Sequence, residues 1–274
     1  MNERYRICII TPSGYKHSSA FLEVALLLKC ALSDCGLRCD MAVNEPLNDA
    51  TNVILGYHLI SDPAVLSGTR YIPYQLEQLS MQEGVYSDKN RRILAGAAEV
   101  WDYSLENRAF LRRSGIAAQH LPLGFHEALE RIAKTDEKDI DILFYGSMNE
   151  RRKRILDALA GCFKVKALFG VYGNERDAWI GRSRLVVNIH HYEAKIFEAV
   201  RLSYLMNNGI FFVSEDSALN PYPDIPICMA PYDKIVDLCK YYMENQALAS
   251  GCARSVYEAF KTKYRMTDLL NKIL

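Results

Sequence analysis

The sequence predicts an α/β protein made of two doubly wound domains that face each other across a cleft. Short runs of β-branched and aromatic residues alternate with helical patterns almost throughout, which is typical of parallel sheets with crossover helices. The alternation begins twice, at residues 6–11 and again at residues 140–145, after a polar and charged stretch. A length of 274 residues also favours two domains over one.

The first domain is predicted over residues 1–127. It opens with a buried strand at residues 6–11, and Ser18 or Ser19 can cap a helix that runs from Ala20 to about Cys35 and stops at Gly36. Further strands are expected at residues 37–43, 52–59, 71–75, 99–103 and 119–122, with helices near residues 87–97 and 105–113.

The second domain is predicted over residues 139–262, after a hinge in the charged stretch 128–139. Strands are expected at residues 140–145, 163–169, 185–190, 210–214 and 227–230, and helices at residues 150–159, 175–182, 194–206, 233–245 and 246–263. A last helix within residues 263–274 is expected to cross back to the first domain.

Composition and motifs exclude several classes of protein. Lys plus Arg and Asp plus Glu both number 33, so no excess charge indicates a polyanionic partner. The eight cysteines form no CxxC pair, which argues against zinc and for reduced, mostly buried thiols.

No GxGxxG or P-loop motif is present, so no cofactor is expected. The apolar runs are too short for a bilayer span and no secretion signal opens the chain, so we expect a cytoplasmic location.

Ligands of doubly wound domains bind where loops leave the carboxyl ends of the strands. The loop at residues 11–19 is one candidate, because Gly14 beside Ser13 lets the backbone approach a ligand. His17 lies near a helix N-terminus, which favours its neutral form. The alternative is a tight turn with capping serines.

The strand end at residues 145–154 is the most informative local feature. Gly146 and Ser147 precede a helix whose first turns carry four consecutive cations, including Arg151 and Lys153. Backbone N–H groups and cations at one point suit a diphosphate. Successive helical residues turn by about 100°, so one or two of the four cations are expected to reach the cleft. The alternative is a solvated helix face.

The segment 190–209 carries unusual polarity in a buried pattern. On the helix expected from residue 194, Lys195, Glu198 and Arg201 are three apart and form one polar stripe. Glu198 is expected to accept hydrogen bonds from ribose hydroxyls while a cation neutralises phosphate; the alternative is an internal ion-pair stripe. The residues that precede the helix, and that are expected to touch a sugar, are His190, His191, Tyr192 and Glu193. No metal site is expected from two adjacent histidines.

A catalytic base that takes the proton of an attacking hydroxyl is expected in the first domain. Glu77 is the first choice, with His17 and Asp102 as further candidates, and its alternative role is a capping or loop residue. The acceptor is expected to contact Ser13, Gly14, His58 and Tyr103. The ring of Tyr103 can stack on a sugar or base; its alternative role is packing in the core.

The order of several segments resembles a GT-B glycosyltransferase, in particular the bacterial polysaccharide-type group related to glycosyl transferase family 1. In the second half these segments are DILFYGS (141–147), NERR (149–152), LVVNIHHYE (185–193), FEAVRLSYLMNNG (197–209) and FFVSE (211–215). In the first half they are ITPSGYKHSSAF (10–21), YQLEQL (74–79), VWDYSLENRAFL (100–111) and HLPLGF (120–125).

The resemblance implies two Rossmann-like domains and a metal-independent transfer of sugar from a nucleotide-diphosphate donor such as a UDP-sugar. It places Gly146 and Arg151 at the phosphate and Glu198 in the ribose-binding stretch. Many members carry two glutamates eight positions apart; here Arg201 stands eight residues after Glu193, so the second acid is absent or replaced by Glu198.

The implied acceptor is a glycan or glycoconjugate, as in polysaccharide biosynthesis. Two alternatives remain. One is transfer to a modified nucleic-acid base, as some phage enzymes perform, in which nucleic acid is a partner only as the acceptor. The other is a non-catalytic module that binds sugar nucleotides or acts as a scaffold.

Overall fold

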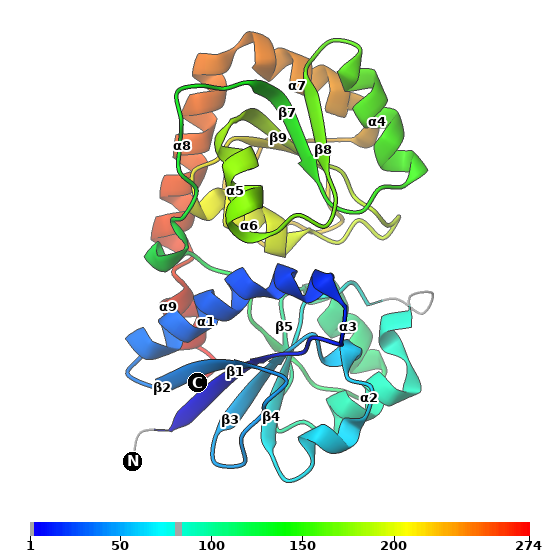
Figure 1. Ribbon diagram of the computed structural model, residues 1–274, viewed down its shortest axis with the longest axis vertical. Helices are drawn as coiled ribbons and strands as arrows, with labels where there is room; N and C mark the ends of the chain where they lie inside the picture. The colour runs from blue at the N-terminus through cyan, green and yellow to red at the C-terminus, as the bar shows by residue number, and fades with distance from the viewer. Residues whose placement is uncertain (1–2, 80–83) are drawn as a thin grey trace. The chain divides into compact units, whose positions relative to one another are not determined.

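A computed structural model describes residues 3–79 and 84–274 of the chain, which divide into two compact units. Unit 1 comprises Met1–Ala128 and Arg265–Leu274, and unit 2 comprises Leu129–Tyr264. Each unit has its own parallel sheet with helices packed against it (Figure 1). The predicted α/β class with two doubly wound sheets is therefore confirmed.

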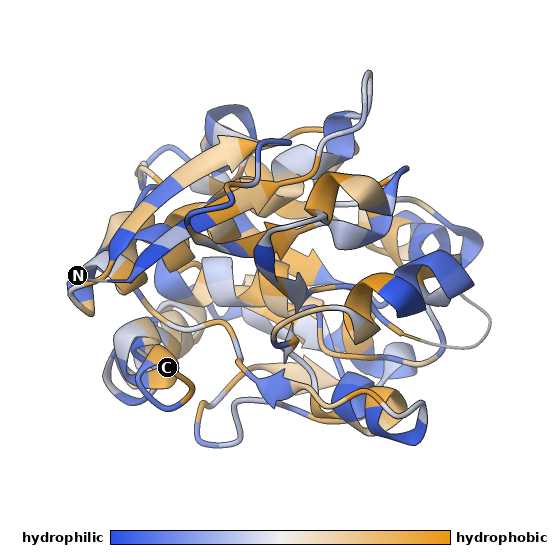
Figure 2. Cartoon of the chain, turned by 90° about the horizontal axis from the view of Figure 1, so that it is seen from below, coloured by the Kyte–Doolittle hydropathy of each residue, from blue (hydrophilic) through white to orange (hydrophobic). Residues whose placement is uncertain are grey.

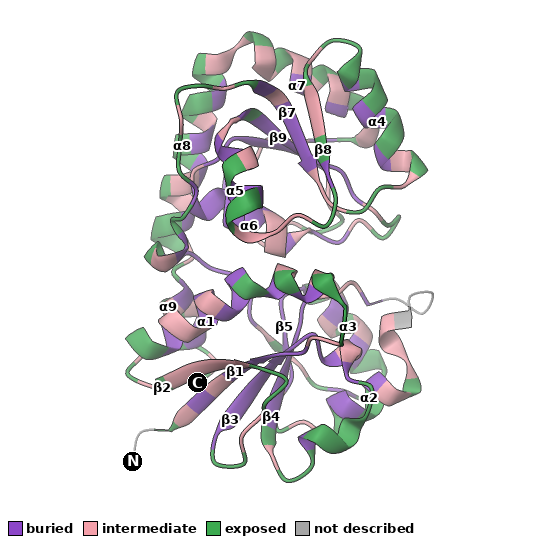
Figure 3. Cartoon of the chain, viewed as in Figure 1, coloured by how far each residue is buried: buried purple, intermediate pink, exposed green. Residues whose placement is uncertain are grey.

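Unit 1 contains a six-stranded parallel sheet in the order β2-β1-β3-β4-β5-β6. The strands are β1 (Arg4–Ile9), β2 (Arg38–Val43), β3 (Thr51–Leu55), β4 (Arg70–Gln75), β5 (Trp101–Asp102) and β6 (Gln119–His120). The helices are α1 (Leu22–Asp34), α2 (Asp88–Ala95), α3 (Leu105–Arg113) and α9 (Met266–Leu270). All residues of β3 are buried, and β1 and β4 pair with it on either side (Figure 3).

Unit 2 contains a five-stranded parallel sheet in the order β11-β10-β9-β7-β8. The strands are β7 (Ile140–Tyr145), β8 (Val165–Leu168), β9 (Ser183–Asn188), β10 (Phe212–Glu215) and β11 (Met229–Ala230). The helices are α4 (Glu150–Ala160), α5 (Gly173–Gly181), α6 (Ala199–Asn207), α7 (Ile235–Glu244) and α8 (Gln246–Lys263). Most helices carry both apolar and polar residues in Figure 2, since each buries one side against its sheet.

The α6 helix begins five residues later than the sequence pattern predicts. Lys195 has a φ of 48°, outside the right-handed helical region, and its carbonyl accepts a hydrogen bond from Ala218 N at 3.0 Å. Glu198 is the residue that precedes the first turn of α6. The predicted stripe of Lys195, Glu198 and Arg201 on one helix face is therefore wrong, because Lys195 lies in a loop tied to a second loop.

The helix expected within residues 263–274 is α9, and Arg265 before it is extended and pairs with Phe125 in a parallel bridge within unit 1. The expectation of mostly buried thiols differs from the structure. Of the eight free cysteines only Cys8 and Cys239 are fully buried, whereas Cys162 is exposed. In the described parts of the chain, no helix is both long and apolar enough to cross a bilayer.

Candidate functional site

The carboxyl ends of β7, β9 and β10, three neighbouring strands of unit 2, bring a group of charged side chains together. Gly146 follows β7 with a φ of 139°, a conformation that favours glycine. Asn149 then caps α4, since its side chain accepts a hydrogen bond from Arg152 N at 2.9 Å. Asn149 Nδ2 also donates to His191 O at 2.9 Å and so ties the α4 turn to the β9 loop.

Glu198 lies between two arginines. Its Oε1 accepts from Arg152 Nη2 at 2.7 Å, and its Oε2 lies 2.7 Å from Arg201 Nη1. Arg152 is only 2% exposed and also donates to the carbonyls of Ile189 and Ser147, each at 2.8 Å. Burial lowers the pKa of Arg152 to about 10, even though Glu198 favours its charged form. The guanidinium therefore remains protonated at neutral pH.

Glu215, the last residue of β10, binds a second pair of cations. Arg151 Nη1 donates to Glu215 Oε2 at 2.5 Å and Arg151 Nη2 donates to Oε1, which makes a two-pronged pair. The Glu215 carboxylate also accepts from His190 N at 3.1 Å and lies 3.4 Å from Lys195 Nζ. The aromatic ring of Tyr232 packs 4.0 Å from Arg151 Cζ.

His190 is fully buried between the two carboxylates. Its Nε2 lies 3.1 Å from Ser217 Oγ, and its Nδ1 is 3.9 Å from Glu198 with no hydrogen-bond partner in the described residues. Burial lowers the pKa of His190, although both glutamates oppose the shift. His190 stands eight residues before Glu198 and its Nδ1 lies 3.9 Å from that carboxylate, whereas Glu193 is exposed.

We call this group the cationic cluster; it comprises Arg151, Arg152, Lys195, Arg201, Glu198 and Glu215. Four cations against two carboxylates leave the cluster with two net positive charges. Gly146 borders the cluster, since its ideal Cβ would lie 2.6 Å from Arg201 Nη2. Half-buried excess charge of this kind attracts an anion. Within the described ranges no group of three metal-ligating side chains is found.

Most donor-site residues expected from sequence meet at this cluster, but not all. Gly146, Ser147, Arg151, His190, Lys195, Glu198 and Arg201 lie in or beside it. Lys153 points away, because its ammonium pairs with Asp157 on the exposed side of α4. Glu193 is exposed, and His191 contributes its carbonyl to Asn149. Sequence reasoning missed Glu215, although an acid at the end of a buried strand is a usable signal.

The catalytic candidates of unit 1 lie after β3, β4 and β5. His58 Nε2 is 3.9 Å from Glu77 Oε1, and burial raises the pKa of Glu77. Asp102 has no exposed surface, and its Oδ1 accepts from Ser104 N at 2.8 Å and Asn107 Nδ2 at 3.2 Å. Burial raises the pKa of Asp102 well above its ordinary value. A carboxyl so enclosed supports the β5–α3 turn and cannot contact an acceptor in this conformation.

The acceptor candidates are distributed over the same unit. Ser13 and Gly14 lie in an exposed turn that closes with a hydrogen bond from Tyr15 N to Pro12 O at 3.0 Å. The ring of His17 lies 5.3 Å from that of Tyr15. Tyr103 is 4% exposed, so its ring packs in the interior rather than on the surface. Among these predicted residues, His58 and Glu77 lie within ion-pair distance of each other.

His58 makes the stability of the protein depend on pH. Burial, and to a smaller extent Lys89, lowers the pKa of His58 to about 4, so unfolding takes up a proton between this value and the unfolded pKa of about 6.5. Stability contributed by neutral His58 is present above pH 6.5 and falls as the pH drops toward 4. Between pH 7 and pH 5, we expect the wild type to lose about 1–2 kcal/mol more than a His58→Gln variant. Urea denaturation at both pH values measures the difference; equal losses would exclude this role.

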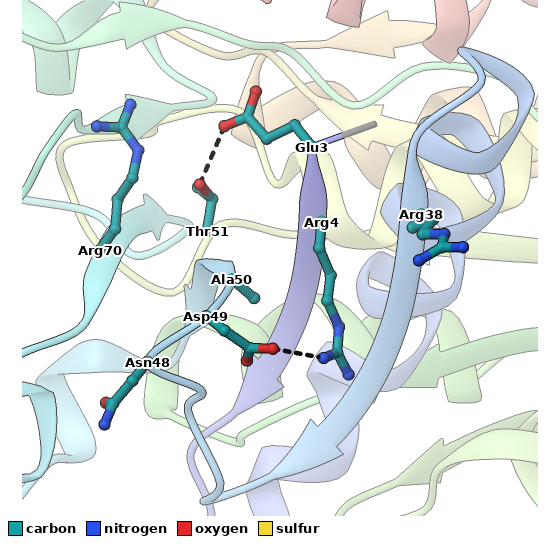
Figure 4. A pocket seen from close by; sticks show the side chains of 8 residues that line it. All are labelled: Glu3, Arg4, Arg38, Asn48, Asp49, Ala50, Thr51 and Arg70. Atoms are coloured by element: carbon teal, nitrogen blue, oxygen red, sulfur yellow. Dashed lines mark hydrogen bonds and ion pairs between the residues drawn. The ribbon is translucent and has the colours of Figure 1, made fainter. Parts of the chain in front are cut away.

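A separate cavity of about 860 Å³ lies at the opposite, amino-terminal edge of the unit 1 sheet (Figure 4). Its lining includes Arg4, Arg38, Thr51 and Arg70, the first residues of β1, β2, β3 and β4. Arg4 pairs with Asp49 and Thr51 donates to Glu3 (Figure 4). None of the predicted acceptor residues lines this cavity.

Comparisons with known proteins give sequence relatives without an assigned function. No family model matches the chain. It is 28% identical over 217 residues to uncharacterized protein L140 of Acanthamoeba polyphaga mimivirus, a match that spans 75% of this chain and 70% of L140. Uncharacterized protein R358 of the same virus is 30% identical over 194 residues, 67% of this chain and 66% of R358. The match to L137 spans only 27% of that relative.

Solved structures establish the fold. Anabaena Alr3699/HepE, crystallised in complex with UDP and glucose, aligns with a TM-score of 0.66 and 11% identity over 99% of this chain and 98% of that one. AviGT4, a glycosyltransferase involved in avilamycin A biosynthesis, aligns with a TM-score of 0.60 and 12% identity, and the match covers 99% and 96% of the two chains. With its two parallel α/β sheets, the protein therefore has the GT-B fold of these glycosyltransferases.

Proposed function

We propose that the protein is a glycosyltransferase that moves a sugar from a nucleoside-diphosphate sugar to an acceptor hydroxyl of a glycan or glycoconjugate. The observation that carries this proposal is the cationic cluster, with two uncompensated positive charges at the carboxyl edge of the unit 2 sheet. A diphosphate carries the complementary charge, and it is the leaving group of such a reaction. The likeness to HepE, which was crystallised with UDP and glucose, makes a UDP-sugar the first donor to test.

The proposed donor site uses the backbone at Gly146 and Ser147 together with Arg151, Lys195 and Arg201 for the diphosphate. These cations stabilise the negative charge that grows on the leaving group, which is a major part of many enzymatic barriers. They supply this charge from side chains, so we propose transfer without a metal ion. Glu198 accepts hydrogen bonds from the ribose hydroxyls, since both of its oxygens retain free lone pairs beside the two arginines.

The proposed acceptor site belongs to unit 1. Glu77 takes the proton of the attacking hydroxyl, and its raised pKa brings the carboxylate closer to the proton affinity that a base needs near neutral pH. His58, 3.9 Å away, stays neutral because of its low pKa and so does not hold Glu77 in its charged form. Ser13 and Gly14, in an exposed turn, are proposed to contact the acceptor, whereas Tyr103 is enclosed in the interior and is not proposed for this role.

Replacing Arg151 by alanine is expected to raise the dissociation constant for UDP by about tenfold to a hundredfold, because it removes a charge-assisted contact worth about 1.5–3 kcal/mol. Isothermal titration calorimetry measures the change. Arg154→Ala is the matched control, since Arg154 is exposed on the same helix and should leave UDP binding unchanged. Equal affinities of the Arg151 variant and the wild type would remove Arg151 from the site.

Donor hydrolysis and transfer separate the proposed enzyme from its alternatives. Purified protein is incubated with a panel of nucleotide sugars, and release of the nucleoside diphosphate is followed with and without glycan acceptors. Turnover supports the glycosyltransferase. Tight binding without turnover supports a module that only binds sugar nucleotides, and salt-dependent retention on DNA supports a nucleic-acid acceptor.

A further inference from the structure

Glu215 is a buried carboxylate whose partners among the described residues belong to the cationic cluster and the loop after β9. It is fully buried at the end of β10, where an unpaired carboxylate is strongly unfavourable. Its carboxylate oxygens contact both Nη atoms of Arg151, the backbone N–H of His190 and the ammonium of Lys195. Two of these three partners are cations proposed to bind diphosphate, so the contacts of Glu215 converge on that site.

Arg151 is held from several directions by these contacts. The Glu215 carboxylate takes both Nη atoms and therefore sets the plane of the guanidinium. Tyr232 packs its ring 4.0 Å from Arg151 Cζ, and Arg151 Nη1 donates to His190 O at 3.1 Å. The side chain nevertheless keeps 22% of its surface exposed, so a ligand can still reach part of it.

Lys195 reaches the same carboxylate from an irregular loop. Its backbone has a φ of 48°, which is costly for a residue other than glycine and persists where surrounding contacts hold it. The carbonyl is held by Ala218 N, and the ammonium lies 3.4 Å from Glu215 with 41% of the side chain exposed. One carboxylate thus gathers two cations at one place and leaves one positive charge uncompensated.

We infer that Glu215 is a positioning residue that presents Arg151 and Lys195 to the diphosphate of the donor. The inference rests on the proposed function, because it assumes that an anion binds at the cationic cluster. Glu215 does not touch the ligand; it acts by fixing the guanidinium plane and drawing the ammonium to the same side. Burial favours its neutral form, but hydrogen bonds from Arg151 and His190 outweigh burial and lower the pKa of Glu215. The carboxylate therefore stays ionised at neutral pH.

A Glu215→Gln variant tests whether Glu215 holds Arg151 and Lys195 in place or acts only through its negative charge. The substitution removes a negative charge next to the site, so electrostatics alone would tighten the binding of an anion. Positioning predicts the reverse: the dissociation constants for UDP and for inorganic pyrophosphate rise about tenfold, because the paired cations lose their common anchor. Isothermal titration calorimetry measures both. Unchanged or tighter binding by a folded variant would overturn the inference.

Matched variants keep the test decisive. Glu175→Gln makes the same charge change at an exposed position of α5 and should leave both dissociation constants unchanged. If Glu215→Gln does not fold, Arg151→Lys keeps the positive charge but loses the two-pronged contact; it should weaken pyrophosphate binding about tenfold, and wild-type binding would overturn the inference. Glu215→Asp, which retains the carboxylate, should recover part of the affinity lost in Glu215→Gln.

Pyrophosphate also separates this inference from the proposed function. If the wild type binds pyrophosphate but neither UDP nor any nucleotide sugar, the donor proposal fails while the Glu215 series can still be measured. If the wild type binds UDP and turns over a nucleotide sugar, but Glu215→Gln binds both probes as the wild type does, only the Glu215 inference fails. If the wild type binds no probe, both fail together.

Discussion

Replacing Glu198 by alanine is expected to lower the free energy of unfolding by about 3–5 kcal/mol, the cost of breaking a buried ion pair from one side. The substitution leaves Arg152, only 2% exposed, and Arg201 without the carboxylate that both contact at 2.7 Å. A buried guanidinium left without its carboxylate is strongly unfavourable. Urea denaturation followed by circular dichroism measures the change.

The matched control for this stability effect is Glu175→Ala, which removes a glutamate from an exposed position of α5. Such a surface substitution is expected to change the unfolding free energy by less than about 0.5 kcal/mol. A loss below about 1 kcal/mol in Glu198→Ala would mean that water, rather than Glu198, compensates the two arginines.

A Gly146→Ala variant is expected to lose UDP binding by more than about tenfold and to be destabilised by about 1–3 kcal/mol. Two causes act together. The φ of 139° lies where side-chain-bearing residues are strained, and an added Cβ would lie 2.6 Å from Arg201 Nη2. Arg201 can move because it is flexible, but movement takes it away from Glu198 and from Asn188, to which it donates at 2.5 Å. Calorimetric titration with UDP and thermal unfolding measure the two effects.

Gly251→Ala serves as the control for the glycine substitution. Gly251 lies inside α8 with open space around an added Cβ, so alanine should leave UDP binding unchanged and stabilise the helix by about 0.5–1 kcal/mol. If Gly146→Ala also bound UDP as the wild type does, the glycine turn would have no part in the anion site.

The two carboxylates of the cationic cluster have different tasks in this scheme. Glu198 lies between Arg152 and Arg201 with 16% of its side chain exposed, so a ribose can reach it. Glu215 has no exposed surface and acts through Arg151 and Lys195. The two substitutions should therefore differ in their main effect. Glu198→Ala should mainly lower the free energy of unfolding, whereas Glu215→Gln should mainly raise the dissociation constants for UDP and pyrophosphate.

Much of the fold and part of the site could be predicted from sequence, because both depend on local patterns. Apolar runs of strand length followed by glycine or polar turns identified the parallel sheets, and the cap at Asn149 lies where the predicted helix after Gly146 begins. The same rule, that polar residues after strands gather at one sheet edge, placed Gly146, Arg151 and Glu198 together.

Charge pairing and loop conformation were decided only by the tertiary structure. Arg151 and Glu215 are 64 residues apart, and Arg152 and Glu198 are 46 apart, so their contacts depend on the order β10-β9-β7 rather than on any local spacing. Helical periodicity placed Lys195 on α6, but a hydrogen bond from Ala218 holds it in a left-handed conformation outside that helix. Sequence thus indicated several of the charges at the strand ends, because burial patterns are local, but it did not single out Glu215. Strand order and loop contacts determined which cation each carboxylate holds, because those pairs form across the sheet.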